Sequence, residues 1–409
     1  MTPQSLWQNR NYRLVFSASA VSNLGDGVSA LALPWLATLI TRDPGLIALV
    51  AMAQRLPWLL FALPAGVWTD RVDRRRLIAR ADLLRMVLTL GIVALALSAT
   101  PFQARMIYPL AILAFLLGAA EVLRDNAAQT ILPSVVAPAD LERANGQMWS
   151  AEQITGQFIG PPLAGALIGL GIAVPFGFDS ATFALASILV WLIVLPPRAP
   201  TAPQRFWPAL QQGIRWISAH RTILQLAVML GFVNFLHMVC FTVLVLYSQE
   251  ILGLSGLGHG LLLTTGAAGG VIGGLAAPRI AARLGMRRSL IAALATFVGG
   301  YLLLSLGGLP LFAGAALFIE AIASMLWNVV TVSYRQRQIP GEILGRVNSV
   351  YRFFGWGSMP LGAMAGGALV AVAEHPLGRD MALRLPFAAA TVGMIILALY
   401  AASRLPRHT

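Results

Sequence analysis

Carboxyl side chains stand inside several of the long apolar stretches that make up most of this sequence. Asp26 lies between two glycines, Glu121 lies one helical turn before Arg124, and Glu320 lies in a run that contains no basic residue. A carboxyl away from water favours its neutral form unless a cation or hydrogen-bond donors stabilise the charge. Groups of this kind can bind and release protons, and no metal-ligand spacing or nucleophile motif accompanies them.

Counting residues along the apolar stretches suggests which of these carboxyls have cationic partners. At about 1.5 Å per residue, Asp26 and Arg55 both lie roughly 20 Å from the arginine-rich ends of their helices, so we expect them to pair. Such a pair either binds substrate or locks two helices together, and the sequence leaves both open. Glu320 has no basic residue at its depth. We therefore expect Glu320 to carry protons, with Glu121 as the alternative.

Most of the chain is apolar enough to lie in lipid. Of its 409 residues, 57% are hydrophobic and 11% are charged, whereas soluble domains average about 45–50% and about 25%. A helix needs about 20 apolar residues to cross a bilayer. We therefore expect an all-α integral membrane protein with twelve transmembrane helices, at 13–40, 46–69, 77–99, 106–131, 144–170, 173–195, 222–250, 259–283, 287–307, 310–336, 345–373 and 382–403.

The basic residues, all of which are arginine, give the orientation. One set of loops holds only Arg42, Arg105, Arg379 and Arg384, and the opposite set holds most of the others. Because cytoplasmic loops are enriched in basic residues, we expect both termini in the cytoplasm and the chain in the cell membrane. The asymmetry accounts for the net charge of +13, so nothing favours a nucleic-acid partner. Cys240 is the single cysteine, which excludes an internal disulfide.

The two halves of the sequence resemble each other. A block of arginines follows the second apolar stretch at 71–76 and the eighth at 283–288, and the fifth and eleventh open with similar Arg-x-Asn sequences. A six-plus-six repeat is typical of transporters. We expect an N-terminal six-helix bundle at 1–195, a cytoplasmic linker with an amphipathic helix at 196–221, and a C-terminal six-helix bundle at 222–409.

The segment GVWTDRVDRR at 66–75 falls between the second and third expected spans. It resembles the loop motif of the major facilitator superfamily, in which a glycine precedes an Asp-Arg pair and a basic pair. Trp68 and Asp73 depart from the residues usual in that motif. The resemblance extends over nearly the whole chain and implies the twelve-helix fold of that superfamily.

The resemblance also implies a gate on the cytoplasmic side, formed by Gly66, Asp70, Arg71 and Arg74. Asp125 lies near the cytoplasmic end of the fourth expected span. In the superfamily, an acid at this place can join the loop motif. Here Asp70, Arg74 and Asp125 would form a charge cluster that latches the outward-facing state.

A second motif, GQFIGPPLAG at 156–165, lies in the fifth expected span. It resembles the Gly-Pro motif that antiporters of the superfamily carry there. Gly156 and Gly160 share one helix face and allow close helix contact, and Gly165 ends the motif. Pro161 removes a backbone donor and favours a bend. The alternative is a packing motif common to membrane helices, and its place in the fifth span favours the antiporter interpretation.

The fragments NAAQTILP at 126–133 and LGRVN at 344–348 resemble the bacterial drug-efflux branch that includes macrolide and enterobactin exporters. In this fold the first and fourth helices of each half line the cavity. The resemblance therefore places five further residues there as candidates for substrate contact: Asn23, Asn234, His237, Trp327 and Asn328. We interpret His237 as a hydrogen-bonded cavity residue, with a proton relay as the alternative. Asp179 is interpreted as a helix N-cap, and Glu152 as a partner of Arg124.

These features predict a secondary active transporter that exports amphipathic small molecules in exchange for protons. A second hypothesis keeps the fold but moves a defined metabolite, siderophore or lipid, outward or inward. A third is a receptor or membrane enzyme on the same scaffold, which lost cavity acids or a large soluble insertion would favour. We expect a monomer with a small-molecule substrate, protons and the lipid bilayer as its partners. No cofactor, metal site or catalytic residue is expected.

Overall fold

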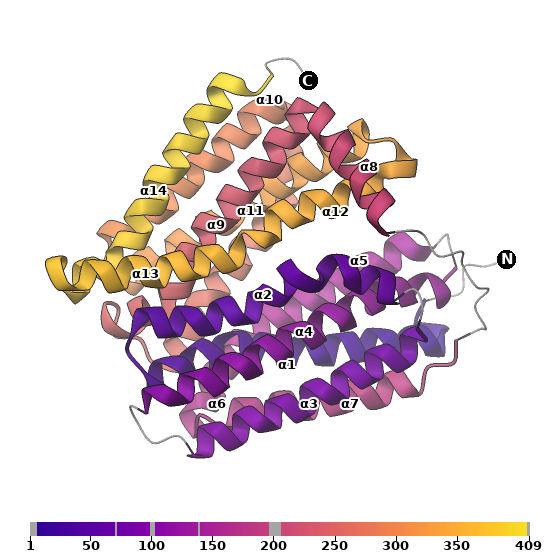
Figure 1. Ribbon diagram of the computed structural model, residues 1–409, viewed down its shortest axis with the longest axis horizontal. Helices are drawn as coiled ribbons and strands as arrows, with labels where there is room; N and C mark the ends of the chain where they lie inside the picture. Colours follow the sequence, from indigo (N-terminus) through magenta and orange to yellow (C-terminus); the bar gives the residue numbers. More distant parts are fainter. Residues whose placement is uncertain (1–5, 70–71, 99–102, 138–139, 196–205, 407–409) are drawn as a thin grey trace. The chain divides into compact units, whose positions relative to one another are not determined.

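The computed structural model describes residues 6–69, 72–98, 103–137, 140–195 and 206–406. Within these ranges every regular element is a helix and no strand occurs (Figure 1). The helices are long, as expected for a chain that satisfies its backbone hydrogen bonds inside lipid. The all-α class predicted from the sequence is confirmed.

The elements follow in the order η1 (Leu6–Gln8), α1 (Arg10–Ile40), α2 (Pro44–Thr69), α3 (Arg74–Ser98), η2 (Ala104–Met106), α4 (Ile107–Ile131), η3 (Leu132–Ser134), α5 (Leu141–Glu152), η5 (Gln153–Ile159), α6 (Gly160–Leu170), α7 (Val174–Trp191), α8 (Phe206–Ala219), α9 (Arg221–Glu250), α10 (Gly256–Leu306), α11 (Pro310–Gln338), α12 (Gly341–Gly357), α13 (Met359–Leu377) and α14 (Arg379–Arg404). Within the described residues, nine helical segments are long and apolar enough to cross a membrane. The full count of twelve spans stays a prediction.

Two predicted spans, at 259–283 and 287–307, lie on the single long helix α10. Its backbone leaves helical geometry at Gly285, where φ is 72° and ψ is 176°. Only glycine adopts such angles at little cost, so Gly285 turns the chain between two helical parts. The expected division of this region is therefore present as a kink inside α10.

The fifth predicted span is interrupted by a π-helical segment, η5, between α5 and α6. Pro161 and Pro162 follow it and have no backbone N–H to donate to the preceding turn. The N–H of Gly160 instead reaches back to the carbonyl of Thr155, which is the wider π spacing. The Pro-Pro pair thus accounts for the π-helical segment, and the bend expected at this motif stays a prediction.

The chain divides into two compact units, each of which is described by itself. Unit 1 comprises residues 1–41, 53–204 and 256–260. In it, α3 packs against α4 and α7, and α1 packs against α6 and α7. One of its apolar cores gathers buried side chains from α1, α3, α4, α5 and α7, including Tyr12, Ile78, Ile131 and Val190. This packing brings the polar faces of α1, α3, α4 and α7 together.

Unit 2 comprises residues 42–52, 205–255 and 261–409. In it, α9 packs against α13 and α14, and α12 packs against α8 and α9. Helix α8 is the amphipathic helix that the sequence predicted. It lies against α12 where Gly213 faces the backbone of Arg346, and Ile217 is buried while Trp207 is largely exposed.

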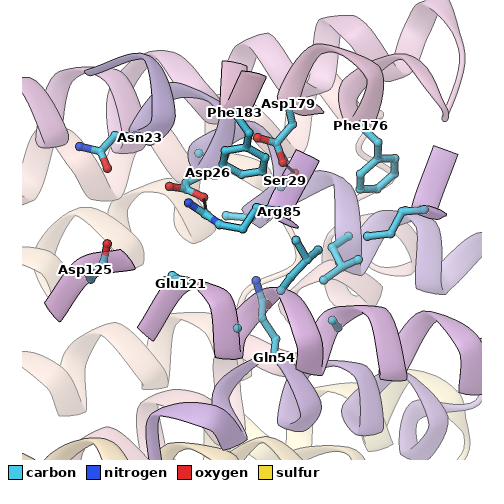
Figure 2. Close-up of a pocket in the computed structure, with 18 of the residues that line it drawn as sticks. Asn23, Asp26, Ser29, Gln54, Arg85, Glu121, Asp125, Phe176, Asp179 and Phe183 are labelled. Carbon is cyan, nitrogen blue, oxygen red and sulfur yellow. Dashed lines mark hydrogen bonds and ion pairs between the residues drawn. The ribbon is translucent and has the colours of Figure 1, made fainter. Parts of the chain in front are cut away.

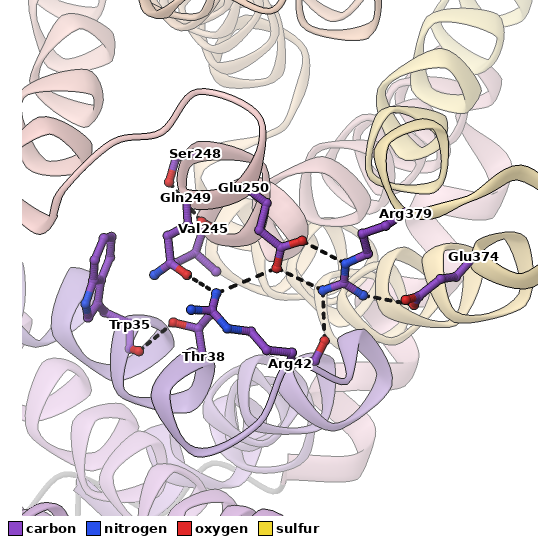
Figure 3. A network of polar contacts seen from close by, with 9 residues as sticks. All are labelled: Trp35, Thr38, Arg42, Val245, Ser248, Gln249, Glu250, Glu374 and Arg379. Carbon is purple, nitrogen blue, oxygen red and sulfur yellow. Dashed lines mark hydrogen bonds and ion pairs between the residues drawn. The ribbon is translucent and has the colours of Figure 1, made fainter. Parts of the chain in front are cut away.

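Polar contacts at one end of unit 2 join the residues that precede α2 to α9, α13 and α14 (Figure 3). The Arg379 guanidinium donates to both carboxylate oxygens of Glu250, at 2.8 and 3.1 Å, and to Glu374 at 2.9 Å. It also donates to the carbonyl of Arg42, whose side chain lies 3.6 Å from Glu250. Arg384 also pairs with Asp380, at 2.9 Å, so three of the four arginines expected outside the cell have acidic partners.

Candidate functional site

A cavity of about 270 Å³ lies inside unit 1 and is lined by ionisable side chains (Figure 2). Its carboxyls outnumber its guanidiniums, since the lining includes Asp26, Glu121, Asp125, Glu152 and Asp179 but only Arg55 and Arg85. Phe176 and Phe183 form apolar parts of the wall. A cavity of this composition can hold a group that is partly apolar and partly charged.

The two glycines beside Asp26 let α1 approach its neighbours on two sides. A Cβ on Gly25 would lie 2.1 Å from the Thr182 hydroxyl of α7. A Cβ on Gly27 would lie 2.2 Å from the carbonyl oxygen of Gly156 in η5. No side chain fits at these distances. The Gly-Asp-Gly sequence therefore places the Asp26 carboxyl between two closely packed elements.

Asp26 pairs with Arg85 of α3, so the predicted pairing of Asp26 with Arg55 is wrong. An Arg85 Nη2–H donates to Asp26 Oδ1, and the Arg85 side chain is 3% exposed. The guanidinium also lies 4.0 Å above the ring centre of Phe183, within cation–π range. Arg55 also lines this cavity, but the ion pair of Asp26 in the described residues is with Arg85. Helix α3 therefore supplies the cation that pairs with Asp26.

A second layer of charges lies behind this pair. Asp82 is fully buried in α3 and has Arg85 at 3.7 Å and Arg124 of α4 at 3.5 Å. Arg124 also donates to Asp125 at 3.2 Å. The sequence analysis did not single out Asp82 or Arg85, although an acid and a base one turn apart in an apolar stretch are a recognisable signal. Together they fix the charge balance beneath the cavity.

Asp179 is a buried residue inside α7 and not an N-cap, because α7 begins five residues earlier. It accepts a hydrogen bond from Ser29 of α1 and one from Thr182 at 3.3 Å. Its carboxyl is therefore held by hydroxyl donors, and it faces the cavity as Figure 2 shows. The span expected at 173–195 already placed Asp179 inside the helix, so the N-cap interpretation rested on its residue type alone.

Glu121 lines the cavity from α4 (Figure 2). Among the described residues it has no cation within ion-pair distance, because the guanidinium of Arg124 contacts Asp82 and Asp125. Glu152 also lines the cavity. The predicted pairing of Glu152 with Arg124 is not among the ion pairs of the described residues. Glu121 thus faces the cavity without a fixed counter-charge.

The glycines of the second motif pack backbone against backbone. A Cβ on Gly160 would lie 2.7 Å from the backbone of Gly27, and one on Gly165 would lie 2.4 Å from the carbonyl oxygen of Gly256. Pro161 is the second residue of α6. These contacts explain why glycine, and no larger residue, stands at these positions. The antiport role of Gly156, Gly160, Pro161 and Gly165 stays a prediction.

The expected cytoplasmic gate falls partly outside the described residues, since Asp70 and Arg71 are not among them. Gly66 lies in α2, and Arg74 is the first residue of α3. Asp125 contacts Arg124 and lines the cavity. The latch of Asp70, Arg74 and Asp125 stays a prediction.

In unit 2, Glu320 has partners that the sequence analysis did not identify. Glu320 is buried in α11, and its Oε1 lies 2.7 Å from Nδ1 of His237 and 2.8 Å from the hydroxyl of Tyr301. The expectation that Glu320 lies alone at its depth is therefore wrong. Its partners are a histidine on α9 and a tyrosine on α10, and neither is an arginine.

The four remaining candidates for substrate contact have different surroundings. Asn23 lines the cavity of unit 1. Asn234 donates to the carbonyl of Gly355 at 2.9 Å and so ties α9 to α12. Trp327 is buried, with no hydrogen-bond partner for its indole N–H in the described part of the chain, and Asn328 is exposed on α11. Their roles in binding stay predictions.

No group of three or more histidine, cysteine or acidic side chains among the described residues could hold a metal ion. The ionisable groups of both units can instead hold charges and protons.

Sequence comparison relates the whole chain to a family of transporters. The model of a family described as transmembrane secretion effector matches residues 1–408. The chain is 26% identical over 368 residues to the multidrug efflux pump Tap of Mycobacterium tuberculosis, covering 87% of this chain and 86% of that one. It is 22% identical over 371 residues to macrolide efflux protein A of Streptococcus pyogenes, covering 87% and 88%.

Solved structures share the fold. A bacterial homologue of the human lysosomal transporter Spinster superposes with a TM-score of 0.76 at 16% identity, covering 98% of this chain and 97% of that one. A bacterial homologue of the iron transporter ferroportin gives a TM-score of 0.74 at 17% identity, covering 97% and 100%. At these identities the likeness concerns the fold and not the cargo.

Proposed function

Because the chain belongs to the transmembrane secretion effector family of major facilitator transporters, we propose that it exports amphipathic small molecules in exchange for protons. The chain is a multi-pass membrane transporter of small molecules and not an enzyme. The finer claims of the proposal are the direction, the cargo class and the coupling ion.

The surplus of carboxyls in the cavity of unit 1 carries the proposal. Five carboxyls line it beside two guanidiniums, as named above, and the buried pair of Asp82 and Arg124 leaves that difference unchanged. Keeping three unbalanced charges in a partly enclosed cavity is costly. Proton binding lowers that charge, and so does a cationic group of a substrate. The cavity therefore suits a cationic substrate, and its surplus of carboxyls supports coupling of substrate binding to proton movement.

Glu121 and Glu320 are the carboxyls best placed to exchange protons. Asp26 and Asp82 already form ion pairs with Arg85. Glu121 has no such partner, and Glu320 contacts two groups that can themselves carry or donate a proton. We assign proton carriage to Glu320, with Glu121 as the alternative carrier beside the substrate.

The cargo class follows from the cavity wall and from the relatives. Aromatic rings and carboxyls line one cavity, which suits a molecule with an apolar body and a basic group. The printed names of two relatives, a multidrug efflux pump and a macrolide efflux protein, describe export of drugs by those proteins. We extend that activity to this chain, acting as a monomer by alternating access with both termini in the cytoplasm.

The test is uphill transport in proteoliposomes under an imposed pH gradient, with tetraphenylphosphonium and a macrolide as probes. Glu320→Gln mimics the neutral carboxyl and cannot release a proton. It should exchange substrate down a gradient while losing gradient-driven accumulation. Glu142→Gln, at an exposed position in the first turn of α5, is the matched control and should behave as the wild type.

Three outcomes would count against parts of the proposal. Full accumulation by Glu320→Gln together with loss in Glu121→Gln would move the carrier to Glu121. Full accumulation by both variants would remove proton coupling through these residues. Transport by the wild type at a rate that does not depend on the pH gradient would overturn the exchange mechanism itself.

The proposed orientation has its own test. Cysteines introduced at 71–76 or 197–205 should react only from the cytoplasmic side, in a variant that lacks Cys240. Labelling of either segment from outside intact cells would reverse the orientation.

A further inference from the structure

One oxygen of Glu320 receives two hydrogen-bond partners from different helices. Oε1 lies 2.7 Å from Nδ1 of His237 on α9 and 2.8 Å from the hydroxyl of Tyr301 on α10. The carboxyl sits where α10 and α11 pack closely, because a Cβ on Gly300 would lie 3.7 Å from the Cβ of Glu320. Three helices thus meet at a single carboxyl.

The three side chains differ sharply in burial. Tyr301 is fully buried, and the side chain of Glu320 is 8% exposed, whereas that of His237 is 41% exposed. The imidazole ring stacks on the ring of Phe241, with 5.7 Å between the ring centres, and this contact restricts the orientation of the imidazole. His237 is therefore the member of the cluster that reaches from the buried carboxyl to the surface of the unit.

Few other ionisable groups face this carboxyl. Cys240, on the same helix as His237, is buried and its thiol points to the carbonyl of Pro386 at 3.6 Å. Within the described residues, the ion-pair partner of Glu320 is His237 and no arginine lies within 4.0 Å of it. A proton that enters or leaves Glu320 therefore has a histidine as its neighbour, a residue type that can both accept and donate a proton.

We propose that His237 relays protons between the surface of unit 2 and Glu320, an inference that rests on the proposed proton coupling. A proton binds the imidazole at Nε2, and the proton on Nδ1 passes along the 2.7 Å hydrogen bond to Glu320 Oε1. The products are a neutral carboxyl and a neutral imidazole that carries its proton on Nε2. Proton release follows the same two transfers in reverse, so protons and charge balance in each direction.

Tyr301 has a different part in this cluster. Its hydroxyl donates to the same Oε1 from a fully buried position, so it fixes the carboxyl oxygen that faces the histidine. Because the phenol keeps its proton at physiological pH, it is a positioning residue and not a second relay. The aligned carboxyl then needs no rearrangement before it accepts the proton from Nδ1.

The experiment compares proton-driven transport with substrate exchange in proteoliposomes, using tetraphenylphosphonium and an internal pH dye. A relay of this kind typically contributes a factor of about 10²–10⁴ to a proton-transfer step, so His237→Ala should lower gradient-driven accumulation at least about tenfold. Substrate counterflow, which needs no net proton movement, should stay close to the wild-type rate. Added imidazole should restore proton-driven accumulation in His237→Ala but leave the wild type unchanged.

Two further variants separate a relay from a structural contact. His237→Gln keeps a polar side chain but cannot titrate, so wild-type accumulation by it would overturn the relay. His220→Ala removes a histidine that stacks on Trp216 at 3.6 Å in α8 and should change nothing. Failure of imidazole to restore His237→Ala would also overturn the relay.

The relay and the proposed function can fail separately. If Glu320→Gln abolishes accumulation while His237→Ala does not reduce it, the relay is wrong and Glu320 remains the carrier. If Glu320→Gln itself accumulates substrate fully, the assignment of the carrier to Glu320 fails, and the relay fails with it.

Discussion

The two units place polar side chains on corresponding helices but with different chemistry. In unit 1 the first, third and fourth long helices supply Asp26, Arg85 and Arg124, and guanidiniums lie beside the buried carboxyls. In unit 2 the first of its long helices, the second part of α10 and α11 supply His237, Tyr301 and Glu320, with no arginine beside the carboxyl in the part of the chain that the structure describes.

This difference separates two uses of a buried carboxyl. A guanidinium keeps its proton under all physiological conditions, so it holds a neighbouring carboxylate in its charged form. A histidine and a tyrosine can stabilise a carboxylate and can also surround a neutral carboxyl at small cost. Corresponding helices therefore surround a buried carboxyl with guanidiniums in unit 1 and with a histidine and a tyrosine in unit 2, the arrangement on which the proposed proton carriage by Glu320 rests.

The largest effect should come from removing the central cation of unit 1. Arg85→Gln leaves Asp26 and Asp82 without their shared partner, and unpairing a buried charge costs about 3–5 kcal/mol. We expect a strong drop in thermal stability in detergent and a loss of transport. Adding Asp26→Asn to Arg85→Gln should recover part of the stability. A stable single variant would show that the charges of unit 1 are not held as a pair.

The next effect concerns the approach of α1 to η5. Gly27→Ala places a Cβ 2.2 Å from a backbone oxygen, and overpacking of this kind costs about 1–3 kcal/mol. Gly169→Ala, in α6 with nothing within 4 Å of its Cβ, is the control and should be neutral or slightly stabilising. Thermal unfolding of both variants measures the difference. Equal stability would mean that the close contact at Asp26 is not required.

A smaller effect should follow the loss of one hydrogen bond in unit 2. Tyr301→Phe removes a donor to Glu320, and a bond of this kind contributes about 0.5–1.5 kcal/mol. Because this donor fixes the carboxyl oxygen that faces His237, its loss should slow gradient-driven transport by a small factor, while counterflow keeps its rate. Gradient-driven transport at the wild-type rate would show that the hydrogen bond from Tyr301 does not position Glu320.

The smallest effect is expected at the exposed pair of Arg76 and Asp73. Its atoms are 3.5 Å apart, and the two side chains are 59% and 44% exposed. Exposed pairs contribute about 0–1 kcal/mol. Arg76→Ala should leave thermal stability almost unchanged, which sets the baseline for the buried pair of Asp26 and Arg85. A loss as large as that of Arg85→Gln would remove the distinction between buried and exposed charges in unit 1.

Sequence patterns located helices well but divided them less well. Apolar length and the punctuation by proline, glycine and arginine placed the expected spans on helical stretches, because a chain in lipid must pair its own backbone groups locally. The expected spans at 144–170 and 345–373 are each divided between two or more helices. The expected start at residue 173 lies within one residue of the start of α7, but Asp179 was assigned to a cap although it lies inside the helix. Helix ends depend on packing and on the neighbouring turn, which single-residue preferences describe poorly.

The sequence by itself determined which ionisable residues lie at membrane depth. Asp26, Glu121 and Glu320 stand out because charged groups in apolar stretches are costly and therefore rare. That argument depends only on the order of residues along one helix. It also yields depth, through the constant rise of the helix, but it carries no information about which neighbouring helix lies opposite.

The tertiary structure alone decided the partners. Asp26 meets Arg85 and not Arg55 because glycine contacts draw α1 toward α7 and η5 and leave α3 facing the carboxyl. Glu320 contacts His237 and Tyr301 because the packing of α9, α10 and α11 directs these three side chains toward one another. The rotation of a helix about its axis and the choice of its neighbour depend on contacts between distant segments, and these set whether a buried carboxyl keeps its charge or passes a proton on.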